Sequence, residues 1–137
     1  KKVPLVRSMD DYVNCPHSRN TEVRLEDILK HPELEVLAKS DEAGVLLVLN
    51  EYGSGSQVFI QGHPEYDRMT LSNEYHRDVA KGLNPALPKN YFTDNNPFSR
   101  PVLCWRNFSN TLYANWLNFY VYQNTPYELS NNFDWVI

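Results

Sequence analysis

The fold of this chain is decided by the stretch Gly44-Val45-Leu46-Leu47-Val48-Leu49-Asn50. Its five central residues are all aliphatic and lack the alternation with polar residues that a half-exposed strand shows. A continuous apolar run of this kind is typical of a strand that is covered on both faces. The turn-forming segment Gly53-Ser54-Gly55-Ser56 follows it. The next segment, Gln57-Val58-Phe59-Ile60-Gln61, is therefore predicted to be the returning strand of a hairpin.

Further elements are predicted on both sides of this hairpin. Residues 34–40 alternate in hydrophobicity over most of their length, which indicates a third strand, and residues 23–30 suggest a short helix. A longer helix is predicted from Met69 to Gly82, with Asp67 as its N-cap and Gly82 as its C-cap. Its apolar residues recur at helical spacing, at Leu71, Tyr75 and Val79.

The last predicted element is a helix over residues 105–123. Its apolar side is expected to comprise Leu112, Trp116, Leu117, Tyr120 and Val121. Between the two longer helices, Pro85, Pro88, Pro97 and Pro101 indicate a long ordered loop, and the tail after Pro126 reads as polar and extended. The fold class is therefore α/β, with three antiparallel strands and two main helices. This is a thin core for an isolated domain, which suggests that strands and helices are missing.

Composition narrows the class of protein. The 137 residues suffice for one domain, and 42% hydrophobic with 22% charged residues is ordinary for a globular protein. The net charge of -4 comes without a basic stripe, which argues against nucleic acid as a partner. No apolar run approaches the roughly 18 residues of a membrane span, so no membrane association is expected. The two cysteines make no disulfide framework, and a reducing cytoplasm is the expected location.

Candidate chemistry lies where the second hairpin strand ends, in Gly62-His63-Pro64-Glu65-Tyr66-Asp67. A histidine is the usual general base near neutral pH, and it works better when a third group fixes its tautomer. Pro64 holds its neighbour extended, so His63 and Glu65 are predicted to lie on one face and to share a hydrogen bond. A His-X-Glu spacing also arises by chance, and a histidine at a strand end is commonly structural, so spacing alone leaves both roles open. None of the histidine spacings matches that of a metal site, so no metal site is expected.

Several motifs, in order along nearly the whole chain, resemble the homoserine O-acyltransferase family, the homoserine O-succinyl- and O-acetyltransferases that begin methionine biosynthesis. The motifs are Pro16-His17-Ser18-Arg19, Gly62-His63-Pro64-Glu65-Tyr66-Asp67, Glu74-Tyr75-His76-Arg77-Asp78, Lys89-Asn90-Tyr91-Phe92 and Asn115-Trp116-Leu117-Asn118-Phe119-Tyr120-Val121-Tyr122-Gln123. The resemblance implies a fold similar to class I glutamine amidotransferases, an α/β sandwich with a Cys-His-Glu triad.

In that family the nucleophilic cysteine sits on a strand-to-helix elbow in the first half of the protein. Neither Cys15 nor Cys104 matches that motif. Residues 1–137 are therefore expected to be a C-terminal portion of the domain, with the nucleophile-bearing half absent and no activity in this chain alone.

The resemblance assigns roles to four residues. His63 is the expected catalytic base, Glu65 orients it, Arg77 binds the substrate α-carboxylate, and Ser18 contacts substrate and influences specificity. On local sequence alone, a surface arginine is the favoured interpretation of Arg77, and Ser18 reads equally well as an ordinary turn serine. The implied reaction transfers an acyl group from acyl-coenzyme A, a co-substrate, to homoserine, without a cofactor, in a full-length protein that is a homodimer.

Two other functions stay open. Phe108 stands where many family members carry a histidine, which suggests a divergent branch and a serine O-acetyltransferase as one alternative. The other alternative is a non-catalytic binding domain that uses the aromatic-rich stretch from Tyr113 to Tyr122 as its recognition face.

Overall fold

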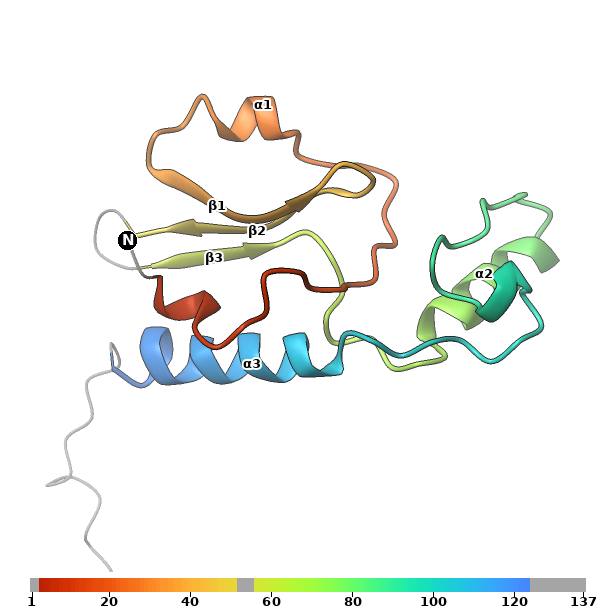
Figure 1. Ribbon diagram of the computed structural model, residues 1–137. Coiled ribbons are helices and arrows are strands. Elements are labelled where there is room, and N and C mark those ends of the chain that lie inside the picture. The colour runs from red at the N-terminus through yellow and green to blue at the C-terminus, as the bar shows by residue number, and fades with distance from the viewer. Residues whose placement is uncertain (1–2, 52–55, 124–137) are drawn as a thin grey trace, which may run out of the picture.

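A three-stranded antiparallel sheet forms the centre of the protein (Figure 1). The computed structural model describes residues 3–51 and 56–123. Strands β1 (Leu34–Ser40), β2 (Gly44–Asn50) and β3 (Gln57–Ile60) lie in the order β1-β2-β3. The predicted strands are confirmed almost to the residue, whereas most of the predicted turn 53–56 and the tail after Pro126 lie outside the described residues.

Strand β2 is buried along both faces, as its apolar run predicts. Its residues from Val45 to Leu49 are all buried, and they divide between two clusters. Two register shifts in the pairing with β1 leave Leu46 without a partner on that strand. Leu46 and Leu47 therefore both join the cluster under α3, where strict alternation would separate them.

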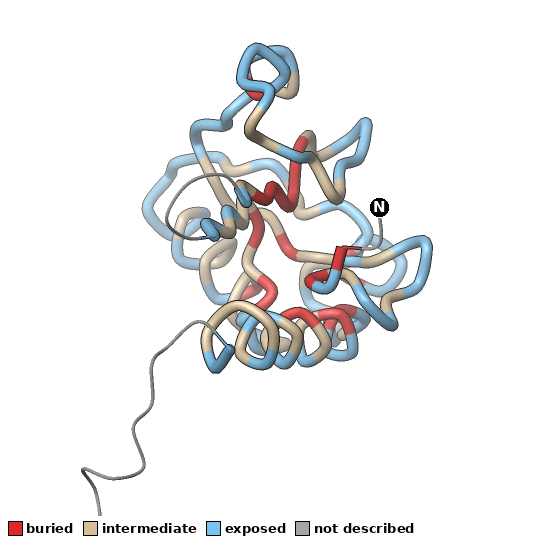
Figure 2. The backbone as a smooth tube through the Cα atoms, turned by 90° about the vertical axis from the view of Figure 1, so that its left-hand side faces the viewer, coloured by how far each residue is buried: buried red, intermediate tan, exposed pale blue. Residues whose placement is uncertain are grey.

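Helices cover the two faces of the sheet (Figure 1). The short helix α1 (Leu25–Ile28) covers one face, where Ile28 packs on Val45 and Val48. Helix α3 (Arg106–Trp116) continues as the π-helical turn η3 (Leu117–Val121) and covers the other face together with the 3₁₀ turn η1 (Pro4–Val6). Figure 2 shows the buried positions concentrated in the sheet and on the side of α3 that faces it.

Helix α2 (Thr70–Ala80) lies to one side of the sheet, against the long loop that follows it (Figure 1). A third cluster forms there around the buried rings of Tyr91, Phe92 and Trp105. The Tyr91 hydroxyl accepts from Ser72 N at 3.0 Å and donates to the Arg68 carbonyl. The loop contains the 3₁₀ turn η2 (Thr93–Asn95) and a bridge from Phe92 to Pro101. The prediction of a long ordered loop is thus confirmed.

Three details of the helix predictions are wrong. Met69, not Asp67, is the N-cap of α2, and no side chain caps this end. Val79 and Trp116 stand on the predicted apolar sides of their helices but are 48% and 40% exposed. His76, also on α2, is half-buried, because it hydrogen-bonds the Pro97 carbonyl and stacks on Phe98. Gly82 does follow α2 with a φ of +72°, the left-handed conformation that glycine adopts readily after a helix.

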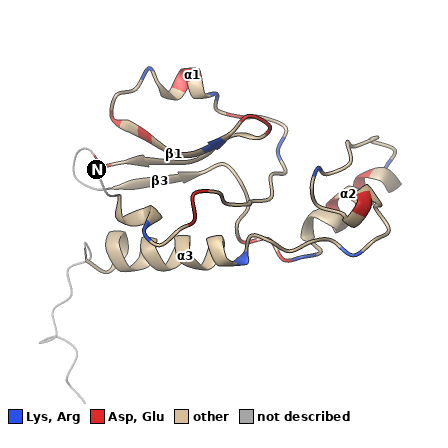
Figure 3. Cartoon of the chain, in the orientation of Figure 1, with Lys and Arg blue, Asp and Glu red and all other residues tan. Residues whose placement is uncertain are grey.

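The described residues contain no helix that is both long and apolar enough to cross a membrane. Basic and acidic side chains are interspersed along the described helices and loops (Figure 3).

Candidate functional site

His63 and Glu65 form a hydrogen-bonded pair at the turn between β3 and α2. The distance from Nδ1 of His63 to Oε1 of Glu65 is 2.9 Å, so the predicted contact is confirmed. A carboxylate only accepts, so Nδ1 of His63 carries the proton and donates it. The neutral ring then has its lone pair on Nε2, which is the arrangement of a general base.

The same tripeptide, His-Pro-Glu, occurs a second time in this chain, at His31-Pro32-Glu33. It also pairs locally, with 3.3 Å between Nδ1 of His31 and Oε1 of Glu33. The pairing is therefore a local property of the tripeptide and does not by itself mark a site. The surroundings distinguish the two copies, since the His31 side chain is 61% exposed and the His63 side chain 34%.

Gly62 brings the segment with Cys15 and Pro16 against the turn that carries His63. A Cβ atom on Gly62 would lie 2.7 Å from the Cys15 sulfur and 3.0 Å from the Pro16 carbonyl oxygen. Real Cβ atoms do not approach other atoms this closely, so only glycine fits here without movement. The His63 amide donates to the same Pro16 oxygen at 2.8 Å, which fixes the loop to the turn.

Arg19 holds the same loop from its other end. Its guanidinium donates to the carbonyls of Gln61 and Ala43, the former at 3.1 Å, and so joins the loop to the sheet. It also donates to Nδ1 of His17 at 2.7 Å. Burial and the neighbouring Arg19 charge lower the pKa of His17, which keeps this imidazole neutral and able to accept.

Tyr66 occupies the centre of the site, a role that the sequence reasoning missed. Its ring stacks on the His63 imidazole, with centroids 4.3 Å apart and planes inclined by 16°. Its hydroxyl donates to Oε1 of Glu74 at 2.8 Å. Burial, followed by the Glu74 carboxylate, raises the pKa of Tyr66 to about 12, so the phenol stays neutral and donates. The available signal was its place directly after Glu65, eight residues before Glu74.

The structure brings three of the four predicted site residues around Tyr66. Ser18 lies beside the Tyr66 hydroxyl, whose pKa it lowers, and His63 stacks on the ring while pairing with Glu65. Arg77 lies on α2, one helical turn after Glu74, and its Nε donates to Oδ1 of Asp78 at 2.7 Å. Arg77 touches none of the other three candidates directly. Asp78 is the main cause that raises the pKa of Arg77. Electrostatic interactions with Glu74 and Tyr66 raise this pKa further.

Neither cysteine has the environment of an activated nucleophile. Burial raises the pKa of Cys15 to about 12, although its sulfur lies close to the His63 backbone. Cys104 is exposed, and desolvation also raises its pKa. Reactive cysteines have lowered pKa values, so both side chains read as protonated thiols near neutral pH.

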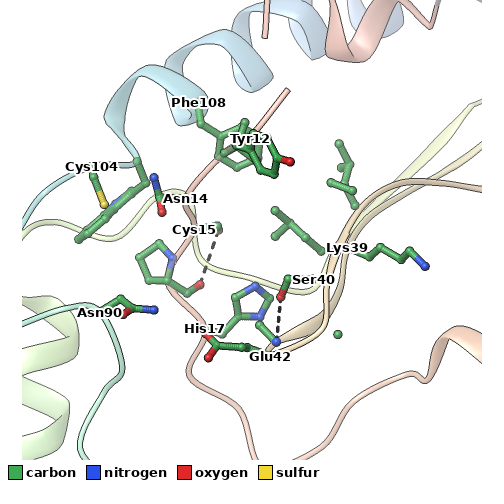
Figure 4. Close-up of a pocket in the computed structure, with 18 of the residues that line it drawn as sticks. Tyr12, Asn14, Cys15, His17, Lys39, Ser40, Glu42, Asn90, Cys104 and Phe108 are labelled. Carbon is green, nitrogen blue, oxygen red and sulfur yellow. Dashed lines mark hydrogen bonds between the residues drawn. The ribbon is translucent and has the colours of Figure 1, made fainter. Parts of the chain in front are cut away.

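A groove of about 1180 Å³ adjoins this site through Cys15, Pro16 and His17. Figure 4 shows Cys15, His17 and Ser40 on its wall, with Phe108 and Cys104 farther along. Neither His63 nor Glu65 lines this groove. The His63–Glu65 pair thus lies at the turn beside the groove. Among residues 3–51 and 56–123, no three His, Cys, Asp or Glu side chains gather closely enough to hold a metal ion.

Comparison with known proteins identifies relatives over nearly the whole chain. The family model of homoserine O-succinyltransferase matches residues 1–127. A homoserine O-acetyltransferase of Agathobacter rectalis is 57% identical over 132 residues, which cover 96% of this chain and 42% of that protein. A homoserine O-acetyltransferase of Thermotoga neapolitana is 53% identical over 131 residues, 96% of this chain and 42% of that protein. A homoserine O-succinyltransferase of Shewanella putrefaciens is 51% identical over 128 residues, 93% of this chain and 40% of that protein. The chain therefore spans about two fifths of the length of these curated relatives.

Proposed function

The chain belongs to the homoserine O-succinyltransferase family, and we propose that it supplies the base of an acyl transfer from an acyl-coenzyme A thioester to the hydroxyl of homoserine. The observation that carries this proposal is the hydrogen bond between His63 and Glu65, at a turn that also gathers Ser18. A family match alone leaves the residues unassigned, whereas this geometry offers a base with a fixed tautomer.

In the proposed reaction His63 acts twice through Nε2. It first accepts the proton of a cysteine thiol, whose sulfur attacks the thioester carbonyl while the bond to coenzyme A breaks. Coenzyme A leaves with that proton. His63 then accepts the proton of the homoserine hydroxyl as its oxygen attacks the enzyme thioester, and the cysteine sulfur leaves. The Glu65 carboxylate stabilises the imidazolium in both steps.

The nucleophile of this reaction is proposed to come from another part of the complete protein. Cys15 is held as a protonated thiol with a pKa of about 12, and Cys104 is an exposed thiol whose pKa is also raised by desolvation. On this proposal residues 1–137 are a C-terminal portion of a domain similar to class I glutamine amidotransferases. The described α/β arrangement is compatible with such a portion.

Substrate binding is assigned to Arg77 and Ser18. The Nε of Arg77 is engaged by Asp78, which leaves the edge with the two terminal nitrogens for a carboxylate in a two-pronged contact. Ser18 lies on the same loop that Arg19 and Gly62 hold against the turn. We also propose a cytoplasmic location and a homodimeric complete protein.

Release of coenzyme A by the complete protein tests the proposal. Purified protein is mixed with acetyl- or succinyl-coenzyme A, and free thiol is followed with homoserine or serine as acceptor. Sustained release with homoserine is the expected result, for one of the two donors, together with no release by the 137-residue chain alone. A preference for serine would identify a serine acyltransferase instead. Binding of an acyl-coenzyme A without transfer to either acceptor would point to a binding domain.

A further inference from the structure

We propose that Tyr66 is a positioning residue for His63, whose ring supports the imidazole while Glu74 holds its hydroxyl. The proposal deepens the function proposed above and rests on His63 being the base. Its starting point is the freedom that Glu65 leaves to the imidazole. One hydrogen bond at Nδ1 fixes the tautomer, but small rotations about the bonds of the His63 side chain can still tilt the ring. The parallel ring of Tyr66, 4.3 Å away, opposes that rotation on one face.

Tyr66 can do this because three contacts hold it in place. Its amide donates to the His63 carbonyl at 3.2 Å, which closes the turn. Its carbonyl accepts from Nε1 of Trp105 at 2.8 Å, and its hydroxyl donates to Glu74 at 2.8 Å. The three contacts come from the turn itself, from the residue that precedes α3 and from α2. The ring is thereby fixed relative to both helices.

Glu74 makes the hydroxyl contact a strong one. Its second carboxylate oxygen, Oε2, is buried and has no hydrogen-bond partner among the described residues. The Tyr66 hydroxyl therefore donates to a carboxylate whose other oxygen has no partner among the described residues, and hydrogen bonds to charged groups exceed neutral ones in strength. Arg77 follows Glu74 by one turn of α2, so the same contact sets the spacing between the base and the proposed carboxylate-binding residue.

The second His-Pro-Glu copy shows what Tyr66 adds. His31 pairs with Glu33 much as His63 pairs with Glu65, but no aromatic stack is found for His31 among the described residues, and its side chain is 61% exposed. The two tripeptides have the same sequence, and only the copy at the candidate site has a stacked ring among the described residues. His31 also serves as an internal reference in the experiment below.

The test uses the complete protein and four variants. Tyr66→Leu removes the ring, Tyr66→Phe keeps the ring without the hydroxyl, and Glu74→Gln weakens the anchor. Tyr91→Phe is the matched control, because Tyr91 also loses a hydroxyl bonded near the start of α2 but does not touch His63. The first readout is the ring proton resonances of His63, which a stacked aromatic ring shields. The second is turnover per folded molecule.

Tyr66→Leu is expected to move the His63 resonances downfield toward those of His31 and to lower kcat by about tenfold to a hundredfold, with the KM for homoserine little changed. Tyr66→Phe should keep the His63 resonances and kcat close to the wild-type values. Glu74→Gln should give values between those of Tyr66→Leu and Tyr66→Phe. Tyr91→Phe should alter only thermal stability. Unchanged His63 resonances in Tyr66→Leu would overturn the proposal, as would a full kcat once the ring is gone.

If Tyr66→Leu does not fold, the comparison of Tyr66→Phe and Glu74→Gln with Tyr91→Phe decides. A kcat loss in Glu74→Gln that is smaller in Tyr66→Phe and absent from Tyr91→Phe supports positioning, and equal kcat in all three overturns it. Failure of the proposed function is distinguishable, since a wild-type protein that transfers no acyl group would still report the Tyr66–His63 stack in its resonances.

Discussion

The imidazole of His63 and the phenol ring of Tyr66 lie stacked, with centroids 4.3 Å apart and planes inclined by 16°. Glu65 engages the same imidazole at its edge, through Nδ1. One face and one nitrogen are thus occupied, and Nε2 is left for a reacting group. A side chain one third exposed can then work as a base, because its orientation is set by neighbours rather than by deep burial.

Replacement of His63 tests its role as the base. His63→Ala in the complete protein should lower acyl transfer by about 10²- to 10⁴-fold, the usual contribution of a positioned base. Glu65→Gln should cost less, because an amide oxygen still accepts from Nδ1 but carries no charge to stabilise the imidazolium. Rates of enzyme acylation and of transfer to homoserine, measured separately, should both fall. His31→Ala alters the equal tripeptide outside the site and should leave both rates unchanged; a comparable loss there would remove the distinction between the copies.

Gly62→Ala tests the close approach between the loop and the turn. The added Cβ would meet Cys15 and Leu46 at 2.7 and 2.8 Å, so the free energy of unfolding should fall by about 1–3 kcal/mol, as for other overpacked sites. Denaturant unfolding measures this. The double variant Gly62→Ala with Cys15→Ala should recover part of the loss, because the nearest atom is gone. A Gly62→Ala protein as stable as wild type would show that the loop moves aside freely.

Much of the fold could be predicted from the sequence because its signals are local. The aliphatic run of β2, the turn residues after it and the helical spacing around Leu71 and Tyr75 each depend on neighbours in the chain. The exposure of Val79 and Trp116 was mispredicted because helical spacing does not show which part of a helix face another element covers. The bulge that turns Leu46 and Leu47 toward one cluster is likewise a tertiary property of the β1–β2 pairing.

The candidate site was predictable to a smaller extent. The His63–Glu65 contact follows from the Pro64 constraint, as the similar His31–Glu33 contact shows. Ser18 and Tyr66 meet only because the chain folds back, with Gly62 and Arg19 joining segments more than 40 residues apart. No periodicity encodes that meeting. The roles of the four predicted residues stay predictions until the variants are measured.

The Cys15 thiol offers a pH-dependent test. Its pKa is raised to about 12, mainly because burial disfavours the thiolate. A thiol with a raised folded-state pKa contributes stability that is fully present below its unfolded pKa of about 8.5 and is lost as the pH rises toward the folded value. The free energy of unfolding should therefore decline between about pH 8.5 and 12, and Cys15→Ala should decline less. In the folded protein at pH 8, iodoacetamide should modify Cys104 well before Cys15. Faster modification of Cys15 would contradict the protonated, buried thiol.

Arg77→Lys tests the proposed grip on the substrate carboxylate. Lysine keeps the charge but loses the two-pronged geometry of the guanidinium. Charge-assisted hydrogen bonds contribute on the order of 1.5–3 kcal/mol, which corresponds to roughly tenfold to a hundredfold in affinity for homoserine. The loss should fall on transfer to homoserine, because acylation by the coenzyme A thioester needs no amino acid.

Asp78→Asn is the matched control for Arg77→Lys. It removes the charge that Nε of Arg77 engages while leaving the guanidinium in place. If Arg77 binds substrate, Asp78→Asn should keep transfer to homoserine within a fewfold of wild type, because the free edge of the guanidinium is unchanged. If Arg77 serves only to pair with Asp78 on the surface of α2, both variants should lower the melting temperature alike and weaken both half-reactions together. Transfer to homoserine that survives intact in Arg77→Lys would show that the carboxylate is bound elsewhere.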